Sequence, residues 1–300
     1  MVKKKKIDAF TVFLHIFFVL FSACFIIPLI LVISASFTSE DALQLGGFGL
    51  LPTDFTLEAY KAAFKNGERM IRAYGVTISQ AFLGTLLSSL VAGMMAYPLS
   101  RSNFRFKGFL TGFIFFTMLF SAGMIPNYIV YARYYKLVDK FLIYILPGIT
   151  GGAWNTLIYR TFFKSLPESL FESARIDGAK ELTVFFKIVV PLSKPVFASI
   201  SFLTLVGRWN NYTTSMIYIR NDKLYTLQYL LQRLMNEANF LKSLINNAEL
   251  GGGMDVSNIT LPSENLKYAM CVIAAGPMLV AFPFFQKYFS KGLTVGAVKG

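Results

Sequence analysis

The residues best suited to a specific task form one charged island, Glu168–Pro191, in an otherwise apolar chain. Pro167 begins a short amphipathic helix there, because a proline in the first turn of a helix loses no hydrogen bond. Gly178 ends this helix, since glycine adopts the left-handed backbone of a helix end and Asp177 beside it favours a turn. A second helical run is expected over 180–190. The pattern predicts two short helices that meet at a bend and fit a socket on another protein.

Apolar side chains are interleaved with the charges of the island, which argues against a plain solvated loop. They are Phe171, Ala174, Ile176, Phe185, Phe186 and Ile188. So many apolar groups are not left in water, so they pack against the chain's own helices or against a partner.

The sequence contains no signature of an enzyme. His15 is the single histidine, which excludes His-based metal sites and catalytic triads, and no Gly-rich phosphate loop ends in Gly-Lys-Ser/Thr. We therefore expect no catalytic residue, no metal ligand set and no cofactor, and any ATP hydrolysis belongs to another subunit. His15 lies in the first apolar run, where an ionisable residue is a functional candidate, but its place near a helix end favours an interfacial or packing role.

A second polar group, Arg208–Thr213, lies inside an apolar run. Polar side chains at membrane depth usually face a bundle interior or a water-filled path, and Trp and Asn suit a sugar. Trp209, Asn210 and Asn211 are thus candidates for a substrate path, reached by one or two of them because successive helical residues point in different directions. They equally suit an interface position or bonds between helices. Arg208 turned outward by snorkelling suits an uncharged glycan, and Arg208 turned inward suits an acidic one.

The composition places these groups in a membrane protein. The chain has 300 residues, is 55% hydrophobic and 15% charged, and its mean hydropathy is +0.54. One soluble core of this size would not use so much apolar surface. The net charge of +13 does not indicate nucleic-acid binding, because the basic residues are scattered at the ends of apolar runs and form no stripe.

Six apolar runs are long enough to cross a bilayer, so we predict a six-span all-α domain over residues 1–300. The first run follows Lys3–Lys6 as in a secretory signal, but its length favours an uncleaved span. The predicted spans are 10–37, 74–98, 109–132, 141–163, 195–219 and 267–288.

The distribution of charge between the spans predicts the orientation. With the N-terminus inside, the inner segments hold 16 basic and 5 acidic residues, and the outer segments hold 12 basic and 11 acidic residues. The positive-inside rule then places both termini and the loop 164–194 in the cytoplasm. The long outer segment 219–266 carries a predicted amphipathic helix over 227–244 and then the flexible Gly251-Gly252-Gly253. Its length favours a functional segment over a simple connection, since most connections are short.

The string Glu172-Ser173-Ala174-Arg175-Ile176-Asp177-Gly178-Ala179, followed by Phe185, Ile188 and Pro191, resembles the EAA loop of binding-protein-dependent ABC importer permeases. The end of the chain, 291–300, resembles the tail of the carbohydrate-importing branch of the maltose-permease G-subunit type. Ser173 departs from the usual second alanine but is also small.

This resemblance implies a permease subunit in a prokaryotic cell membrane, importing oligosaccharides or complex glycans. It also implies a second permease subunit, two cytoplasmic ATPase subunits and an extracytoplasmic solute-binding protein, with Glu172, Ala174, Asp177 and Gly178 coupling the loop to the ATPase. A permease for another solute, such as a polyamine or a phosphate ester, and a non-transporting membrane scaffold or sensor remain alternatives.

Overall fold

The computed structural model describes residues 9–65, 67–247 and 264–292 of the protein. In these residues the regular secondary structure is helical, and the one β-bridge pairs Thr38 with Phe55. The protein thus has the all-α fold that its composition predicts. Its contacts group the chain into two compact units, one drawn from 1–67 and 233–276 and the other from 68–232 and 277–300.

The first unit is built on α1 (Ala9–Ser36), whose apolar side chains are largely exposed along most of its length. Buried Asn265 donates from its carboxamide to the Thr38 carbonyl (3.0 Å), and its N–H donates to the Glu40 carboxylate (3.2 Å). These bonds tie the start of α14 (Glu264–Gly292) to the turn after α1. The unit also contains α2 (Glu40–Gly46), α3 (Glu58–Ala63) and most of α13 (Leu227–Asn247).

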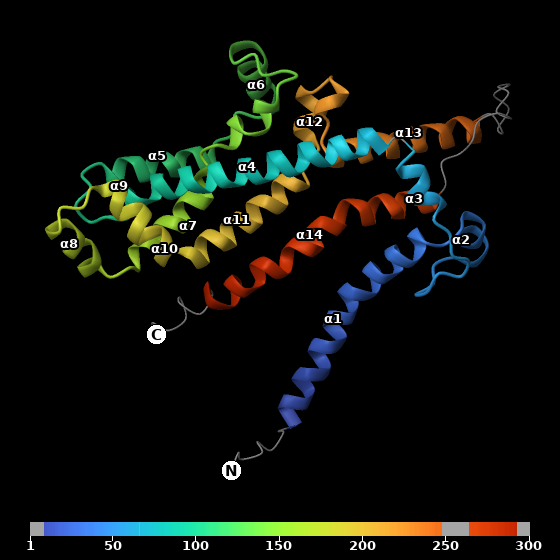
Figure 1. The fold of residues 1–300 in the computed structure, drawn as a ribbon, viewed down its shortest axis with the longest axis horizontal. Coiled ribbons are helices and arrows are strands. Elements are labelled where there is room, and N and C mark those ends of the chain that lie inside the picture. Colours follow the sequence, from blue (N-terminus) through green and yellow to red (C-terminus); the bar gives the residue numbers. More distant parts are fainter. Residues whose placement is uncertain (1–8, 66, 248–263, 293–300) are drawn as a thin grey trace. The chain divides into compact units, whose positions relative to one another are not determined.

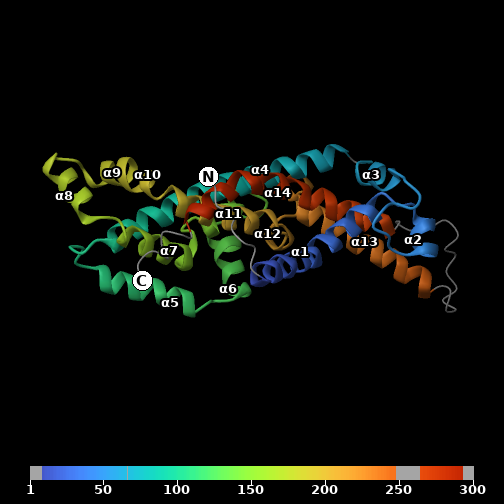
Figure 2. The same ribbon diagram turned by 90° about the horizontal axis from the view of Figure 1, so that it is seen from below.

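The second unit is organised along α4 (Gly67–Ser100), and in Figures 1 and 2 α8 lies beyond one end of this helix. Its other α-helices are α5 (Lys107–Leu119), α6 (Met124–Ile129), α7 (Gly152–Lys164), α8 (Glu168–Ile176), α9 (Glu181–Val184), α10 (Val190–Leu192), α11 (Lys194–Trp209) and α12 (Thr213–Tyr218). Short π-helices cover Val130–Tyr134 and Phe185–Val189, and short 3₁₀ helices cover Phe141–Tyr144, Leu146–Gly148 and Asp222–Leu224.

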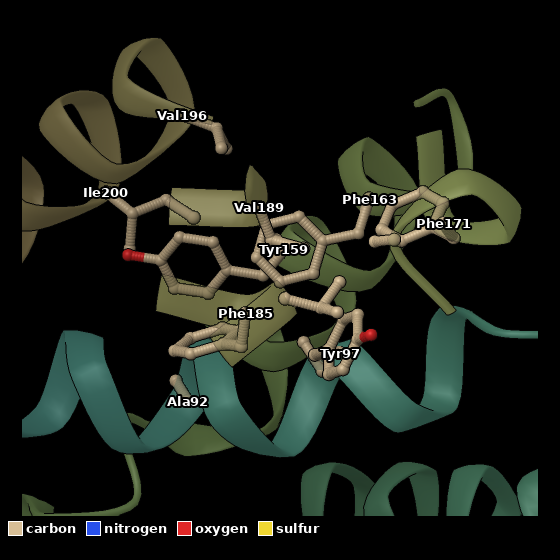
Figure 3. Packing of buried hydrophobic residues seen from close by; sticks show 12 residues of the cluster. Ala92, Tyr97, Tyr159, Phe163, Phe171, Phe185, Val189, Val196 and Ile200 are labelled. Atoms are coloured by element: carbon tan, nitrogen blue, oxygen red, sulfur yellow. The ribbon is translucent and has the colours of Figure 1, made fainter. Parts of the chain in front are cut away.

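The core of the second unit joins α8 to the longer helices (Figure 3). Aromatic rings from four segments meet there, those of Tyr97, Tyr159, Phe163, Phe171 and Phe185. Each ring is at most 7% exposed. Full burial of a ring this large stabilises by about 1.5–3 kcal/mol, so α8 is part of the packed body and not a loose appendage.

In the part of the chain that the structure describes, three helices, α1, α4 and α14, are long and apolar enough to cross a membrane, and three bent pairs bring the possible number to six. The predicted span 109–132 is broken, since α5 and the segment that begins with α6 are bent by 109°. Gly123, at φ +81°, lies in this break. The predicted span 141–163 is broken in a similar way: two 3₁₀ turns and α7 are bent by 50°, and Gly151 and Gly152 have positive φ.

The predicted span 195–219 contains two helices. The helix α11 ends at Trp209, and α12 begins only at Thr213. The helical run after the bend of the island continues to Leu192 and so does not end at Pro191, since the first turn of α10 accommodates the proline. The helix predicted over 227–244 is present as α13, and Gly251-Gly252-Gly253 lies outside the described residues.

Candidate functional site

The bend after α8 is a complete Schellman motif. The N–H of Gly178 donates to the Arg175 carbonyl (3.0 Å), and the N–H of Ala179 donates to the Ala174 carbonyl (2.9 Å). Gly178 has φ +73°, the left-handed conformation that this motif requires, and a Cβ there would meet no atom within 4 Å. The glycine is therefore needed for its backbone and not for space.

The two helices of the loop 164–194 have an inner and an outer face. Phe171 and Ala174 point inward and lie in the core of the second unit. Ile176, Leu182 and Phe186 point outward, with exposed fractions of 86%, 61% and 48%. The loop is thus anchored by one apolar face and presents a second.

Arg101, directly after α4, holds the loop 164–194 through several contacts. Its guanidinium donates to the Glu168 carboxylate (3.3 Å), to the Phe163 carbonyl (2.6 Å) and to the Ser100 hydroxyl (3.0 Å). It also lies 3.8 Å from the centre of the Phe171 ring. Burial lowers the pKa of Arg101 and the Glu168 carboxylate opposes this, so the guanidinium stays charged.

A second polar contact joins α4 to α9. The Tyr97 hydroxyl donates to the Glu181 carboxylate (2.6 Å), which also forms an ion pair with Arg175 (3.7 Å). A cavity of about 460 Å³ lies between these groups, lined in part by Tyr97, Arg101, Arg175, Glu181 and Phe104. We call the contacts of Arg101 and Tyr97 with the loop the α4 clamp.

A polar cavity of about 490 Å³ surrounds the point where α11 ends, and we call it the Arg208 chamber. The Asn211 carboxamide accepts from the N–H of Thr214 and so starts α12 after the break. The polar side chains that line the chamber are Ser88, Tyr144, Thr150, Thr204, Arg208, Asn211 and Thr214. Hydroxyl groups thus make up most of its polar wall.

Arg208 points into the second unit. Its Nη1 donates to the Tyr144 carbonyl (2.8 Å) and its Nη2 to the Gly148 carbonyl (3.2 Å). These carbonyls belong to the segment of 3₁₀ turns before α7, and that of Gly148 also accepts from the N–H of Gly151 (3.1 Å). No carboxylate of the described residues forms an ion pair with Arg208. Of the two directions considered for Arg208, the structure shows the inward one, because the side chain takes these inner acceptors.

Two glycines make room for the guanidinium. A Cβ on Gly84 would lie 2.6 Å from Cζ of Arg208, and a Cβ on Gly148 would lie 2.8 Å from its Nη2. Real side chains do not approach so closely, so any larger residue at either position displaces the arginine.

Comparison with known proteins identifies the fold and the family. The family described as "Binding-protein-dependent transport system inner membrane component" matches residues 84–295. The chain belongs to this family. This permease is 36% identical to Protein LplC of Bacillus subtilis (strain 168), over 92% of this chain and 90% of that one.

Two further relatives are informative. The permease is 35% identical to the polygalacturonan/rhamnogalacturonan transport system permease protein YtcP of the same organism, over 97% of this chain and 98% of that one. A crystal structure of "a bacterial ABC transporter involved in the import of the acidic polysaccharide alginate" contains a chain that matches with a TM-score of 0.77 and 29% identity, over 96% of this permease and 99% of that chain.

The residues expected to couple to an ATPase fall on both faces of the loop. Glu172 and Asp177 are exposed, and Gly178 forms the bend. Ala174, by contrast, is 7% exposed and packs inside the permease, so it supports the helix from within.

The residues expected along a substrate path are separated by the end of α11. Asn211 lines the Arg208 chamber, whereas Trp209 is 2% exposed and its ring packs beside that of Tyr74 at 6.4 Å. Asn210 is exposed and accepts from the Gln228 carboxamide (3.5 Å). His15 is exposed and bonds to the Thr11 carbonyl of its own helix (2.6 Å).

Sequence reasoning missed the α4 clamp. Arg101 and Tyr97 are four residues apart at the end of the second apolar run, so they share a helix face, and this spacing is the one available signal. Their partners Glu168 and Glu181 lie more than 60 residues away in the chain, where no local pattern connects them.

Proposed function

We propose that the permease is one membrane subunit of an ATP-driven importer of oligosaccharides or complex glycans. It pairs with a second permease subunit, two cytoplasmic ATPase subunits and an extracytoplasmic solute-binding protein. ATP hydrolysis takes place in the ATPase subunits, and the permease converts it into alternating access. The family description and the printed names of the glycan-transporting relatives support this proposal.

The observation that carries the proposal is the two-faced loop 164–194. Its inner face is locked to α4 through the α4 clamp and Phe171, so a force on the loop reaches a spanning helix directly. Its outer face exposes Ile176, Leu182 and Phe186, which form an apolar surface that a partner would cover. The partner we propose is the cleft of an ATPase subunit, with Glu172 and Asp177 making polar contacts at its rim.

The orientation follows from the charges that surround this loop. Basic residues outnumber acidic ones in the segments that join the predicted spans on the loop's side, as the positive-inside rule requires of a cytoplasmic face. We therefore place the loop and both termini in the cytoplasm. The segment 219–266, which contains α13, then faces outward and is available to the solute-binding protein.

Gly178→Val and Glu172→Lys test the coupling role. The first puts a β-branched residue at φ +73°, and the second reverses an exposed charge. Both are expected to abolish substrate-stimulated ATPase activity of the reconstituted importer or to release the ATPase, while the permease still inserts in the membrane. The readouts are ATP hydrolysis in proteoliposomes and co-purification of the ATPase.

Gly178→Asn is the matched control, because asparagine tolerates the left-handed conformation. It is expected to keep most of the stimulated activity. Wild-type stimulation in both Gly178→Val and Glu172→Lys would contradict the coupling role. A permease that recruits no ATPase at all would instead indicate a membrane scaffold or sensor.

A further inference from the structure

Arg208 lines the chamber that carries its name with a positive charge that no carboxylate of the described residues balances. Two of the five N–H donors of its guanidinium are used by the Tyr144 and Gly148 carbonyls. The side chain is partly exposed, and the chamber is the cavity that it lines. The remaining donors are therefore available to a molecule inside the chamber.

A cation within a membrane protein is expensive unless an anion or a water-filled space offsets its charge. Backbone carbonyls supply partial negative charge, but no carboxylate of the described residues pairs with Arg208. Gly84 and Gly148 both lack the side chain that would push the guanidinium aside. The fold thus holds a guanidinium without a carboxylate partner in a fixed place at the wall of a cavity.

The rest of the chamber wall narrows the chemistry of a ligand. Hydroxyls of Thr150, Thr204 and Thr214 and the carboxamide of Asn211 line it. Such groups donate to and accept from sugar hydroxyls, and a guanidinium binds a carboxylate through two parallel N–H donors. A volume of about 490 Å³ lies within the usual range for small-ligand sites.

We propose that the Arg208 chamber binds the carboxylate of a uronic-acid residue, so that the permease selects acidic glycans during translocation. This rests on the proposed function and narrows its substrate class from glycans to acidic glycans. The carboxylate forms a charge-assisted pair with the guanidinium, and the hydroxyl-rich wall holds the sugar ring.

Cysteine protection in the purified complex tests this site directly. Thr150→Cys, in a background where Cys24 and Cys271 are replaced by serine, reports on the chamber through its rate of labelling by an uncharged maleimide. A galacturonic-acid trisaccharide is expected to slow labelling about 10-fold or more, and its methyl-esterified form to have little effect, since a charged hydrogen bond is worth about one decade in affinity.

Two variants locate the effect at the guanidinium. Arg208→Gln removes the charge, and Gly84→Ala keeps it but displaces it; both are expected to abolish protection by the acidic trisaccharide. Arg208→Lys keeps a charge without the two-pronged geometry and is expected to retain partial protection. An unchanged rate of labelling at position 150 in the absence of sugar shows that each variant preserves the chamber.

Equal protection by the acidic and esterified sugars would overturn the proposal, as would full protection that survives both Arg208→Gln and Gly84→Ala. Protection by inorganic phosphate as strong as that by the trisaccharide would also overturn it, because the chamber would then be a general anion site. The assay needs no ATP hydrolysis, so its outcome is independent of the loop variants that test the proposed function.

Discussion

Arg101 and Arg208 both place a guanidinium among the helices of the second unit, but among the described residues only Arg101 meets a carboxylate. Arg101 pairs with Glu168 and stacks on Phe171, so a carboxylate balances its charge and the two contacts join α4 to the loop 164–194. Arg208 meets the carbonyls of Tyr144 and Gly148 and faces a cavity.

The difference separates two uses of a buried charge. The charge of Arg101 is balanced by an acidic partner and covered by a ring, so even beside a cavity this guanidinium serves to hold two segments together. A guanidinium held by backbone carbonyls keeps most of its charge for a ligand, because a dipole compensates only part of it. The α4 clamp is accordingly a mechanical joint, and the Arg208 chamber is a binding site.

The largest expected effect is on stability and distinguishes the two arginines. Arg101→Met leaves the Phe163 carbonyl and the Glu168 carboxylate without their donor and is expected to lower the free energy of unfolding by about 3 kcal/mol. Arg208→Met is expected to lower it by about 1 kcal/mol, since the loss of two bonds is offset by removal of a charge that has no carboxylate partner. Unfolding in mixed micelles with SDS measures both.

The matched control is Arg69→Met, which removes an ion pair with Asp222 in which both side chains are about half exposed or more. Its expected change is about 0.5 kcal/mol or less. Equal losses for the Arg101 and Arg208 variants would contradict the division into a structural and a ligand-binding arginine.

The second prediction concerns Gly151 and Gly152 in the wall of the Arg208 chamber. A Cβ on Gly151 would lie 2.7 Å from the Ser88 carbonyl and 2.8 Å from Cβ of Ala92, whereas a Cβ on Gly152 would meet nothing within 4 Å. Both have positive φ, so both alanine variants carry strain of about 1 kcal/mol. Gly151→Ala is expected to cost about 2 kcal/mol more than Gly152→Ala, measured by the same unfolding assay, because α7 must move away from α4.

Equal changes in the two glycine variants would show that α7 yields without loss and that close packing does not define this wall. Maleimide labelling of the Thr150→Cys variant supplies a second readout. Gly151→Ala is expected to alter the labelling rate, because Gly151 lines the chamber and follows Thr150 directly.

Local signals in the sequence predict the short helix α8 and its bend. The direction of Arg208 could not be predicted, because it depends on contacts with residues distant in the chain. Pro167 and Gly178 specify the start and end of α8 through their own backbone preferences, so the helix and its bend could be predicted. The direction of Arg208 depends on Tyr144 and Gly148, about 60 residues earlier in the chain. A single sequence contains no local pattern that links residues so far apart.

The broken spans illustrate the same limit at membrane depth. Hydropathy located the apolar run 195–219, because composition alone decides whether a segment avoids water. Hydropathy did not locate the end of α11. An asparagine such as Asn211 inside an apolar run can bond to a neighbouring helix within the membrane or begin a new helix, and the sequence does not distinguish the two. The Asn211–Thr214 bond is what selects the helix start.

A third prediction compares two tyrosines, one from each region. Tyr97→Phe removes the donor to Glu181, and Tyr144→Phe removes the hydroxyl that contacts Ser215 and the Leu224 carbonyl. Each is expected to cost about 1 kcal/mol of stability. Tyr97→Phe is expected to weaken the stimulation of ATP hydrolysis at saturating substrate, because it loosens the α4 clamp. Tyr144→Phe, at the wall of the Arg208 chamber, is expected at most to raise the substrate concentration that stimulation needs. Reduced stimulation in both variants to the same degree would mean that coupling follows stability and not the clamp.

The smallest expected effect concerns Asp139, a negative charge held by backbone N–H groups, which is the counterpart of the positive Arg208 held by backbone carbonyls. Asp139 accepts from the N–H groups of Asn221 (2.8 Å) and Arg220 (2.6 Å), much as Arg208 donates to two carbonyls. These two bonds, that of Asn221 first, hold the pKa of Asp139 below its ordinary value. A depressed folded pKa means that the stabilisation is present above the unfolded pKa of about 4 and is lost as pH falls through the folded value.

Unlike Arg208, Asp139 lies near water, so we expect an ordinary anchor worth roughly 0.5 kcal/mol and no ligand. The measurement is hydrogen exchange at the Arg220 and Asn221 amides, compared between wild type and Asp139→Asn at each pH, so that intrinsic exchange cancels. Wild type is expected to protect these amides more than the variant near pH 6, and the difference is expected to disappear as the pH falls through the depressed pKa of Asp139 and the carboxyl becomes protonated. A difference that persists unchanged below that pKa would show that geometry, not charge, holds this turn, and would weaken the contrast drawn with Arg208.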